Sequence, residues 1–342
     1  MKKALILSLS FYTCIYPQFA HALTALPKSP EIPKDNPQSV EKINLGKTLY
    51  FDPRLSKNGM LSCNSCHNLA LGGDDNRAVS LSFKGEKGGR SSPTVWNSAF
   101  HTTQFWDGRE KSLEAQAVGP IVNPVEMGMP DFPTVVERLK KIPGYVTMFD
   151  KVFGKNSITK ENIGKALASF ERTLVTPNSP FDQYMHGNKK ALSPEAQRGM
   201  KLVQEVGCTV CHSGANFSGE NKMGEGNFQK FPVYPDNDYV KKYNLMVDTG
   251  RFTVTNVEDD KHIWRVPTWR NIALTAPYFH NGSVKTLDEA VRVMAKAQLN
   301  MDLKENQVKD IVAFLTSTTG TFPKIEIPRL PPTLGETVVD ED

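Results

Sequence analysis

Cysteine is scarce in this sequence. Only five occur among 342 residues, and four of them form two close pairs, Cys63 with Cys66 and Cys208 with Cys211. The fifth, Cys14, lies in an N-terminal segment that has the pattern of a signal peptide. Disulfides are the usual expectation for an exported protein, but cysteines two residues apart would close a small, strained loop. The pairs therefore indicate a use other than a disulfide framework.

Basic clusters and long apolar runs are also missing. The net charge is only +4 and no block of lysine or arginine occurs, so we expect no nucleic-acid partner. Beyond the N-terminus, no apolar run reaches the ~18 residues that a membrane-spanning helix needs. We therefore expect no membrane span in the mature chain.

The N-terminus has the pattern of a secretory signal. Lys2 and Lys3 precede an apolar run over residues 4–16, and residues 20–22, Ala-His-Ala, fit a small-x-small cleavage site. The run is too short to cross a bilayer, and the alternative is an N-terminal helix of the core. We predict a signal peptide at residues 1–22, cleaved after Ala22, and export to an oxidising compartment, the periplasm.

Histidine follows each cysteine pair directly. Cys63, Cys66 and His67 form one Cys-x-x-Cys-His motif, and the second consists of Cys208, Cys211 and His212. This pattern is the attachment signature of c-type haem, in which both thiols bind the porphyrin and the histidine binds iron. One copy could equally be a thioredoxin-like or zinc motif. Two copies that account for every mature cysteine predict two covalently bound haem c groups.

The two halves of the chain carry related segments. The first cysteines of the two motifs are 145 residues apart, and KENIGKALASF at residues 160–170 resembles KENQVKDIVAF at 304–314. Both segments have apolar residues at helical spacing, and a similar segment precedes each motif. A helix, a haem motif, a loop-rich middle and a terminal helix form the plan of a small cytochrome c domain. We predict an all-α fold of two tandem cytochrome c-like domains, each enclosing one covalent haem c, with long loops.

A segment rich in proline, glycine and asparagine, residues 176–199, contains the predicted domain boundary. Within it, Ser193 and Pro194 fit the N-cap and first turn of the next helix. The end of the chain has four prolines and acidic residues, which predicts an extended segment. The predicted units are an N-terminal domain at residues 23–182, a C-terminal domain at 183–320 and a tail at 321–342.

Longer blocks closely resemble those of the bacterial di-haem cytochrome c peroxidase family, which includes MauG. The resemblance covers about residues 40–320, and the blocks occur in the family's order. They are SCNSCHNLALGG, SPTVWNSAF, QFWDGR, GPIVNPVEM, TPNSPFDQYMHG and RVPTWRNIALTAPYFHNGSVKTLDEAV. The resemblance implies reduction of H₂O₂ to water, with electrons from a small c-type cytochrome or a blue-copper protein (a cupredoxin), and commonly a homodimer.

The resemblance also implies roles for individual residues. His67 would bind the iron at which peroxide reacts, whereas His212 and Met294 would bind the iron of a second haem, where electrons enter. A methionine opposite histidine raises the potential, which suits an electron-receiving haem. Trp106 matches a tryptophan between the two haems, where its indole offers an electron path.

Two polar residues match the family's peroxide pocket. Glu126 corresponds to a carboxylate that moves a proton from the inner to the outer peroxide oxygen, so that the leaving group departs as water. A partly buried carboxyl with a raised pKa suits this task. Gln116 matches a neighbouring glutamine that can donate a hydrogen bond to peroxide.

One position departs from the family. Many members hold a histidine that caps the peroxidatic iron, but Phe83 stands there and cannot bind iron; His101 is the remaining candidate cap. We therefore predict an open sixth position that needs no reductive activation. MauG-like members, which oxidise a partner protein, share this feature, yet MauG has tyrosine where Met294 stands. A peroxidase is our main interpretation, a MauG-like oxidase the alternative, and a plain electron carrier would need both irons six-coordinate.

The family also binds calcium, using backbone carbonyls and one asparagine. The carbonyl positions match Thr275 and Pro277, but Ser91 occupies the asparagine position. Calcium favours oxygen ligands, and serine is a poorer ligand than asparagine. The resemblance implies one calcium ion, with these three residues as its candidate ligands.

Overall fold

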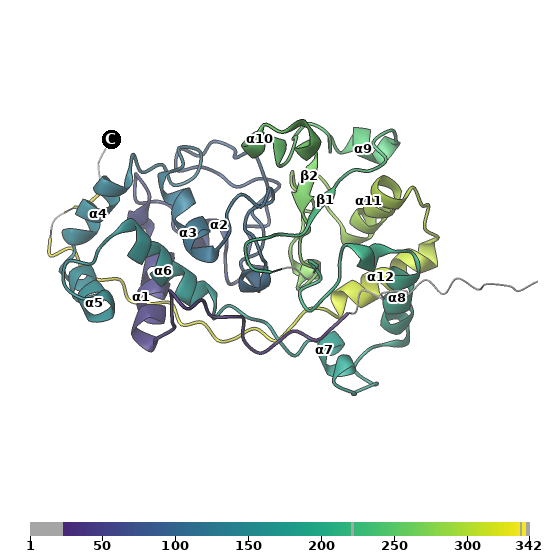
Figure 1. The fold of residues 1–342 in the computed structure, drawn as a ribbon, viewed down its shortest axis with the longest axis horizontal. Coiled ribbons are helices and arrows are strands. Elements are labelled where there is room, and N and C mark those ends of the chain that lie inside the picture. Colours follow the sequence, from purple (N-terminus) through teal and green to yellow (C-terminus); the bar gives the residue numbers. More distant parts are fainter. Residues whose placement is uncertain (1–22, 220–221, 336, 340–342) are drawn as a thin grey trace, which may run out of the picture.

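The computed structural model describes residues 23–219, 222–335 and 337–339; the predicted signal peptide lies outside them. The described chain is mostly helical with little sheet, as expected from the sequence (Figure 1). Its α-helices are α1 (Val40–Phe51), α2 (Cys63–Cys66), α3 (Leu113–Val122), α4 (Phe132–Lys140), α5 (Pro143–Phe153), α6 (Lys160–Glu171), α7 (Pro180–Met185), α8 (Pro194–Glu205), α9 (Asp238–Lys242), α10 (Phe252–Thr255), α11 (Leu287–Leu299) and α12 (Glu305–Thr316).

Shorter elements lie between these helices. They are the 3₁₀ helices η1 (Pro53–Leu55), η2 (Ser98–Phe100), η3 (Cys208–Val210), η4 (Glu258–Asp260) and η5 (Ile272–Leu274), and the antiparallel strands β1 (Phe228–Lys230) and β2 (Ile263–Arg265). The predicted cap at Ser193 is confirmed, since its hydroxyl accepts a hydrogen bond from the amide of Ala196 and Pro194 opens α8. No helix in the described ranges has the length and apolar character needed to span a bilayer.

Two helix pairs repeat the same packing. Helix α1, which precedes the first cysteine motif, packs on α6, which follows it. In the same way, α8 precedes the second motif and packs on α12, which follows it. Each contact passes through a glycine: a Cβ on Gly46 would overlap the carbonyl oxygen of Ala166, and one on Gly199 would overlap that of Asp310. Glycine thus lets both pairs approach closely. The shared packing matches the sequence similarity between residues 160–170 and 304–314.

The apolar core is divided between the halves of the chain. One cluster runs from Leu45 to Leu174 and fills the space between α1, α3, α4, α5 and α6. A second cluster joins Leu23 and Phe181 to α8 and α12, and a third packs α9 against α11. Figure 1 shows the two groups of helices side by side, with loops between them.

Both ends of the described chain cross from one group of helices to the other (Figure 1). Leu23 pairs with Gly214 in a parallel bridge beside the second motif, whereas Asn36 donates to Glu114 of α3. The C-terminal segment leaves α12 and packs Phe322 edge-on against Trp96, with a centroid distance of 4.9 Å. Residues 321–335 and 337–339 contain no helix or strand, and Phe322, Ile325 and Val338 pack against the apolar core of the N-terminal helices.

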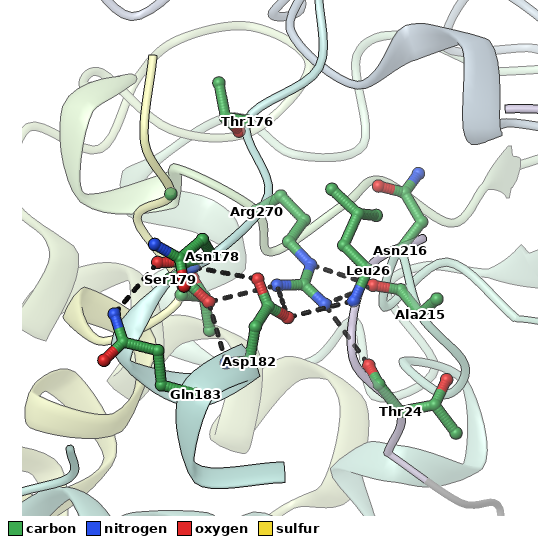
Figure 2. A network of polar contacts seen from close by, with 12 residues as sticks. Thr24, Leu26, Thr176, Asn178, Ser179, Asp182, Gln183, Ala215, Asn216 and Arg270 are labelled. Carbon is green, nitrogen blue, oxygen red and sulfur yellow. Dashed lines mark hydrogen bonds and ion pairs between the residues drawn. The ribbon is translucent and has the colours of Figure 1, made fainter. Parts of the chain in front are cut away.

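A buried ion pair anchors the N-terminal crossing (Figure 2). Arg270 is fully buried and places Nη1 2.7 Å from Oδ1 of Asp182, at the start of α7. The same carboxylate oxygen accepts from the amide of Leu26, at 2.9 Å. The guanidinium also donates to the carbonyls of Thr24 and Ala215. One side chain therefore joins the N-terminal segment, α7 and the loop after the second motif.

We expect Asp182→Asn to destabilise the protein strongly, because it leaves a buried guanidinium without its counter-ion. Removing one partner of a buried ion pair costs about 3–5 kcal/mol. Denaturant-induced unfolding of the intact protein measures this loss. Asp310→Asn is the matched control: it breaks an exposed pair with Arg198, which water already screens, so its loss should be much smaller. Equal losses in both variants would contradict the role given to Arg270.

Candidate functional site

The first cysteine motif forms a short helix, α2, that ends at His67. The hydroxyl of Tyr50 donates to the carbonyl of His67 at 2.6 Å, which ties this turn to α1. The ring atom Nδ1 lies 2.9 Å from the carbonyl oxygen of Pro93. Because a carbonyl only accepts, Nδ1 carries the hydrogen and Nε2 keeps its lone pair. Burial lowers the pKa of His67, so the ring is held neutral, as an iron ligand must be.

The second motif repeats this arrangement on η3. Nδ1 of His212 lies 2.9 Å from the carbonyl oxygen of Phe217, so its Nε2 is again the free ring nitrogen. The ring stacks on Trp269 at a centroid distance of 4.4 Å. Burial lowers the pKa of His212 to about 4. Both histidines thus present one oriented lone pair, which fits the demands of a proximal haem ligand.

All four cysteines are free thiols in the described chain. Burial raises the pKa of Cys66 and of Cys208 to about 11, and that of Cys63 still further. Thiols held in the neutral form are poor redox nucleophiles, which counts against a thioredoxin-like use. The described residues also contain no group of three or more His, Cys, Asp or Glu that could hold a metal ion, which counts against zinc. Covalent attachment of haem fits the residues present.

A buried nitrogen offers a further test of this fit. Nε2 of His280 is buried and has no hydrogen-bond partner among the described residues. Its ring stacks on Trp264 at 4.2 Å, and its carbonyl accepts from the amide of Ser91. An orphaned polar atom of this kind indicates a missing partner, and a haem carboxylate would satisfy it.

One cavity brings together most of the predicted residues of the first site. It encloses about 1370 Å³ of empty space, including its mouth. The predicted residues that line it are Cys63, Cys66, His67, Ser91, His101, Trp106, Gln116 and Glu126. Residues from α2, from α3, from the loops between them and from the loop after α3 therefore face one space.

Gln116 and Glu126 are positioned by different kinds of local structure. Gln116 is held on α3, whereas Glu126 follows that helix in a loop and is half-buried. Burial raises the pKa of Glu126, and the positive charge of Arg109 and a hydrogen bond from Asn123 act in the opposite direction. A carboxyl with a raised pKa takes up and returns a proton near neutral pH more readily than an exposed one.

Trp106 lies where the two halves of the chain meet. Its indole Nε1 donates to the carbonyl of Ser91 at 2.8 Å, and its own carbonyl accepts from the amide of Arg265 on β2. The indole is thus fixed by the N-terminal half and its backbone by the C-terminal half. This placement is what an electron path between two haems would need.

Phe83 is held away from this cavity. Its ring packs against Gly128, whose φ of +72° and lack of a Cβ make room for it. Its amide donates to the carbonyl of Glu126, and its carbonyl accepts from Asn58 at 2.7 Å. The loop that carries a capping histidine in many relatives is therefore fastened at three points.

His101 lines the cavity but is poorly suited to cap an iron. Nδ1 lies 2.7 Å from Nη1 of Arg265, which can only donate. Nδ1 is therefore the acceptor, and Nε2 of the neutral ring carries the hydrogen. Burial and the charge of Arg265 lower the pKa of His101 well below its usual value. The geometry favours a role in joining the two halves.

Met294, Thr275 and Pro277 are not among the residues that line this cavity. Ser91 lines it, but its backbone makes other contacts. Met294 is a partly buried residue of α11, and its ligation of iron stays a prediction. The backbone of Ser91 is occupied, since its amide donates to His280 and its carbonyl accepts from Trp106. The described residues contain no group of three or more His, Cys, Asp or Glu placed to hold a metal ion, so calcium at Thr275, Pro277 and Ser91 would depend on carbonyls, a hydroxyl and water.

Sequence reasoning missed several residues of the cavity, two of which are charged and buried. Arg265 holds His101, and Glu171 at the end of α6 presents a buried carboxyl. Neither belongs to a motif with a known ligand spacing, and Glu171 reads as an ordinary charged residue beside Arg172. Only the packing of α6 could show that its side chain is buried.

The chain belongs to the di-haem cytochrome c peroxidase family. A model of that family, described as di-haem cytochrome c peroxidase, matches residues 40–190. Among its members, the chain is similar to the cytochrome c551 peroxidase of Nitrosomonas europaea, 43% identical over 88% of this chain and 86% of the relative. The cytochrome c551 peroxidase of Pseudomonas aeruginosa is 44% identical over 87% and 84%. Membership implies two haem c cofactors.

Two further relatives extend the comparison toward MauG. The methylamine utilization protein MauG of Methylorubrum extorquens is 35% identical, over 89% of this chain and 86% of its own. The crystal structure of a MauG-like protein associated with microbial copper homeostasis matches with a TM-score of 0.76 and 31% identity, covering 86% of this chain and 95% of that one. Fold and sequence therefore agree on the family.

We expect each cysteine motif to bind one haem covalently. The double variant Cys63→Ala/Cys66→Ala should retain one haem per chain after denaturation, against two in the unaltered protein. The double variant at Cys208 and Cys211 is the matched control and should also retain one. Haem staining of denaturing gels and a haem-to-protein ratio measure this. Two covalent haems in either variant would rule out these cysteines as the attachment points.

Proposed function

We propose that the chain is a periplasmic di-haem peroxidase that reduces H₂O₂ to water with electrons from a small redox protein. The observation that carries this proposal is the shared cavity of Cys63, Cys66 and His67 with Trp106, Gln116 and Glu126. The relatives named cytochrome c551 peroxidases support it. The net reaction is H₂O₂ + 2H⁺ + 2e⁻ → 2H₂O.

The proposed architecture follows the predicted domains. Residues 23–182 would enclose the haem where peroxide reacts, and residues 183–320 the haem where electrons enter, ligated by His212 and Met294. The donor would be a small c-type cytochrome or a cupredoxin, and the enzyme a homodimer. One calcium ion would bind at Thr275, Pro277 and Ser91.

The haem held by Cys63, Cys66 and His67 supplies an iron that binds peroxide and exchanges electrons. The protein's own residues supply the proton movement. Glu126 accepts the proton of the inner peroxide oxygen and returns it to the outer one, so that this oxygen leaves as water. Gln116 donates a hydrogen bond that orients the peroxide, and Trp106 provides an aromatic path toward the second half of the chain.

A MauG-like oxidase is the alternative. Phe83 in place of a capping histidine favours it, as do the MauG relatives and the MauG-like crystal structure. Met294, which stands where MauG has tyrosine, favours the peroxidase. Adding a reduced small cytochrome and H₂O₂ separates the two, because only the peroxidase consumes two electrons from that donor for each peroxide.

We expect Glu126→Gln to lower kcat/KM for H₂O₂ by about 10²–10⁴-fold, the range of general acid–base catalysis. Since the carboxylate form accepts the first proton, kcat/KM of the unaltered enzyme should fall as the pH drops through the raised pKa of Glu126. This limb of the pH profile should vanish in the variant. Glu137→Gln, an exposed change on α4, is the control. An unchanged profile in Glu126→Gln would contradict the assignment.

The open sixth position has a direct spectroscopic test. The fully oxidised protein should give a high-spin ferric EPR signal beside a low-spin one, and it should react with H₂O₂ without prior reduction. Phe83→His is the paired variant; because its loop is fastened away from the cavity, we expect it to keep the high-spin signal. Two low-spin signals in the unaltered protein, unreactive until reduced, would show that another residue caps the iron.

A further inference from the structure

Glu171 carries a buried carboxyl that the proposed mechanism does not use. It is the last residue of α6 and lines the same cavity as Cys63 and Glu126. The residue is only 5% exposed, and its buried Oε2 has no hydrogen-bond partner within the described ranges. A buried polar atom without a partner is rare in folded proteins and needs a physical explanation.

None of the salt bridges of the described residues involves this carboxyl. Arg172 is next in sequence, but its two terminal nitrogens bind both carboxylate oxygens of Glu114, at 2.6 and 3.0 Å. The other titratable groups that act on it are Tyr50 from α1 and Cys63 from α2. Burial raises the pKa of both, so they stay neutral near pH 7. Beside Glu171 itself lie one cation that is already paired, one anion and two neutral groups. The other cations that line the cavity are also engaged: Arg90 and Arg109 pair with Asp107, and Arg265 contacts His101.

An ionised carboxylate in this position has no local compensation. The effective penalty for burying one unpaired ion is several kcal/mol, so the acid form is favoured while no cation pairs with this carboxyl. In agreement, burial raises the pKa of Glu171 to about 8; Arg172 lowers it and Glu114 raises it. The group can therefore change its charge near pH 8.

We propose that Glu171 releases and takes up a proton in step with the charge of the haem held by Cys63, Cys66 and His67. This inference rests on the proposed function of that cavity. A ferric haem core carries one more positive charge than a ferrous one, and a carboxyl in the same low-dielectric space interacts with it strongly. The oxidised haem favours the carboxylate, and the reduced haem favours the acid.

The step is balanced in charge and atoms. One electron arrives from the donor, one proton comes from solvent, and Glu171 changes from carboxylate to carboxylic acid. The cavity gains no net charge, which lowers the cost of placing an electron in a buried site. Glu171 touches neither peroxide nor iron in this scheme, so its role is to compensate charge. It also holds a proton close to a reaction that consumes two protons.

Thermodynamic linkage between electron and proton binding determines whether the midpoint potential rises or falls with pH. If reduction raises the pKa of Glu171, deprotonation must lower the affinity of the haem for its electron by the same free energy. The midpoint potential of this haem then falls as the pH rises between the two pKa values and is flat outside them. A full single-proton coupling gives ~59 mV for each tenfold change in proton concentration.

Potentiometric titration of the haem held by Cys63, Cys66 and His67, from about pH 5 to about pH 9, tests the proposal. We expect the slope of the unaltered protein to be reduced in Glu171→Gln, which keeps the shape and removes the charge. Glu161→Gln makes the same change on the exposed face of α6 and should keep the original slope. A slope in Glu171→Gln equal to that of the unaltered protein would overturn the proposal.

A second readout guards against a variant that folds poorly. Reduction of the unaltered protein should produce an infrared carbonyl band of a protonated carboxylic acid, which is absent in Glu171→Gln and retained, shifted, in Glu171→Asp. Lack of this band would also overturn the proposal. Peroxide turnover is measured separately. If turnover is absent but Glu171→Gln still reduces the slope of the midpoint potential against pH, the peroxidase function alone is refuted. If turnover is normal and Glu171→Gln leaves that slope unchanged, this inference alone is refuted.

Discussion

A guanidinium cannot lose its charge in a protein interior, and the fold depends on satisfying the one at Arg270. Its acceptors come from the carboxylate of Asp182 and from the carbonyls of Thr24 and Ala215 (Figure 2). Because each acceptor belongs to a different stretch of chain, a single buried cation fixes how three segments meet. The loop after the second cysteine motif is one of them, so the support of His212 depends on residues at the very start of the described chain.

The two cysteine motifs share their support and differ in their surroundings. In both, a backbone carbonyl orients the histidine through Nδ1. Trp269 stacks against His212, whereas His67 faces a cavity that also contains Glu126 and Gln116. A stacked aromatic favours a fixed coordination, and a polar cavity admits a small reactant. The same pentapeptide can therefore serve two tasks, and its neighbours decide which one.

Sequence patterns predicted the helical fold, the cap at Ser193, the related segments at residues 160–170 and 304–314, and the family. These follow from local spacing and from long motifs, both of which are visible in a single sequence. The acceptor role of His101 Nδ1 and the isolation of Glu171 could not be predicted in this way. Each depends on which side chains are adjacent after packing, and no spacing rule encodes the burial of a charged residue next to a paired arginine. Met294 and the calcium residues rest on the resemblance alone.

The bond between Arg270 and Thr24 spans 246 positions of sequence. Residues synthesised among the first must therefore wait for residues made near the end before their contacts can form. Closing so long a loop has an entropic cost that no local contact offsets, and folds rich in distant contacts form slowly. Until that late step, Leu23 and Leu26 remain apolar and uncovered. The chain is thus most exposed to aggregation during the interval before Arg270 is in place, which is a problem of timing and not of final stability.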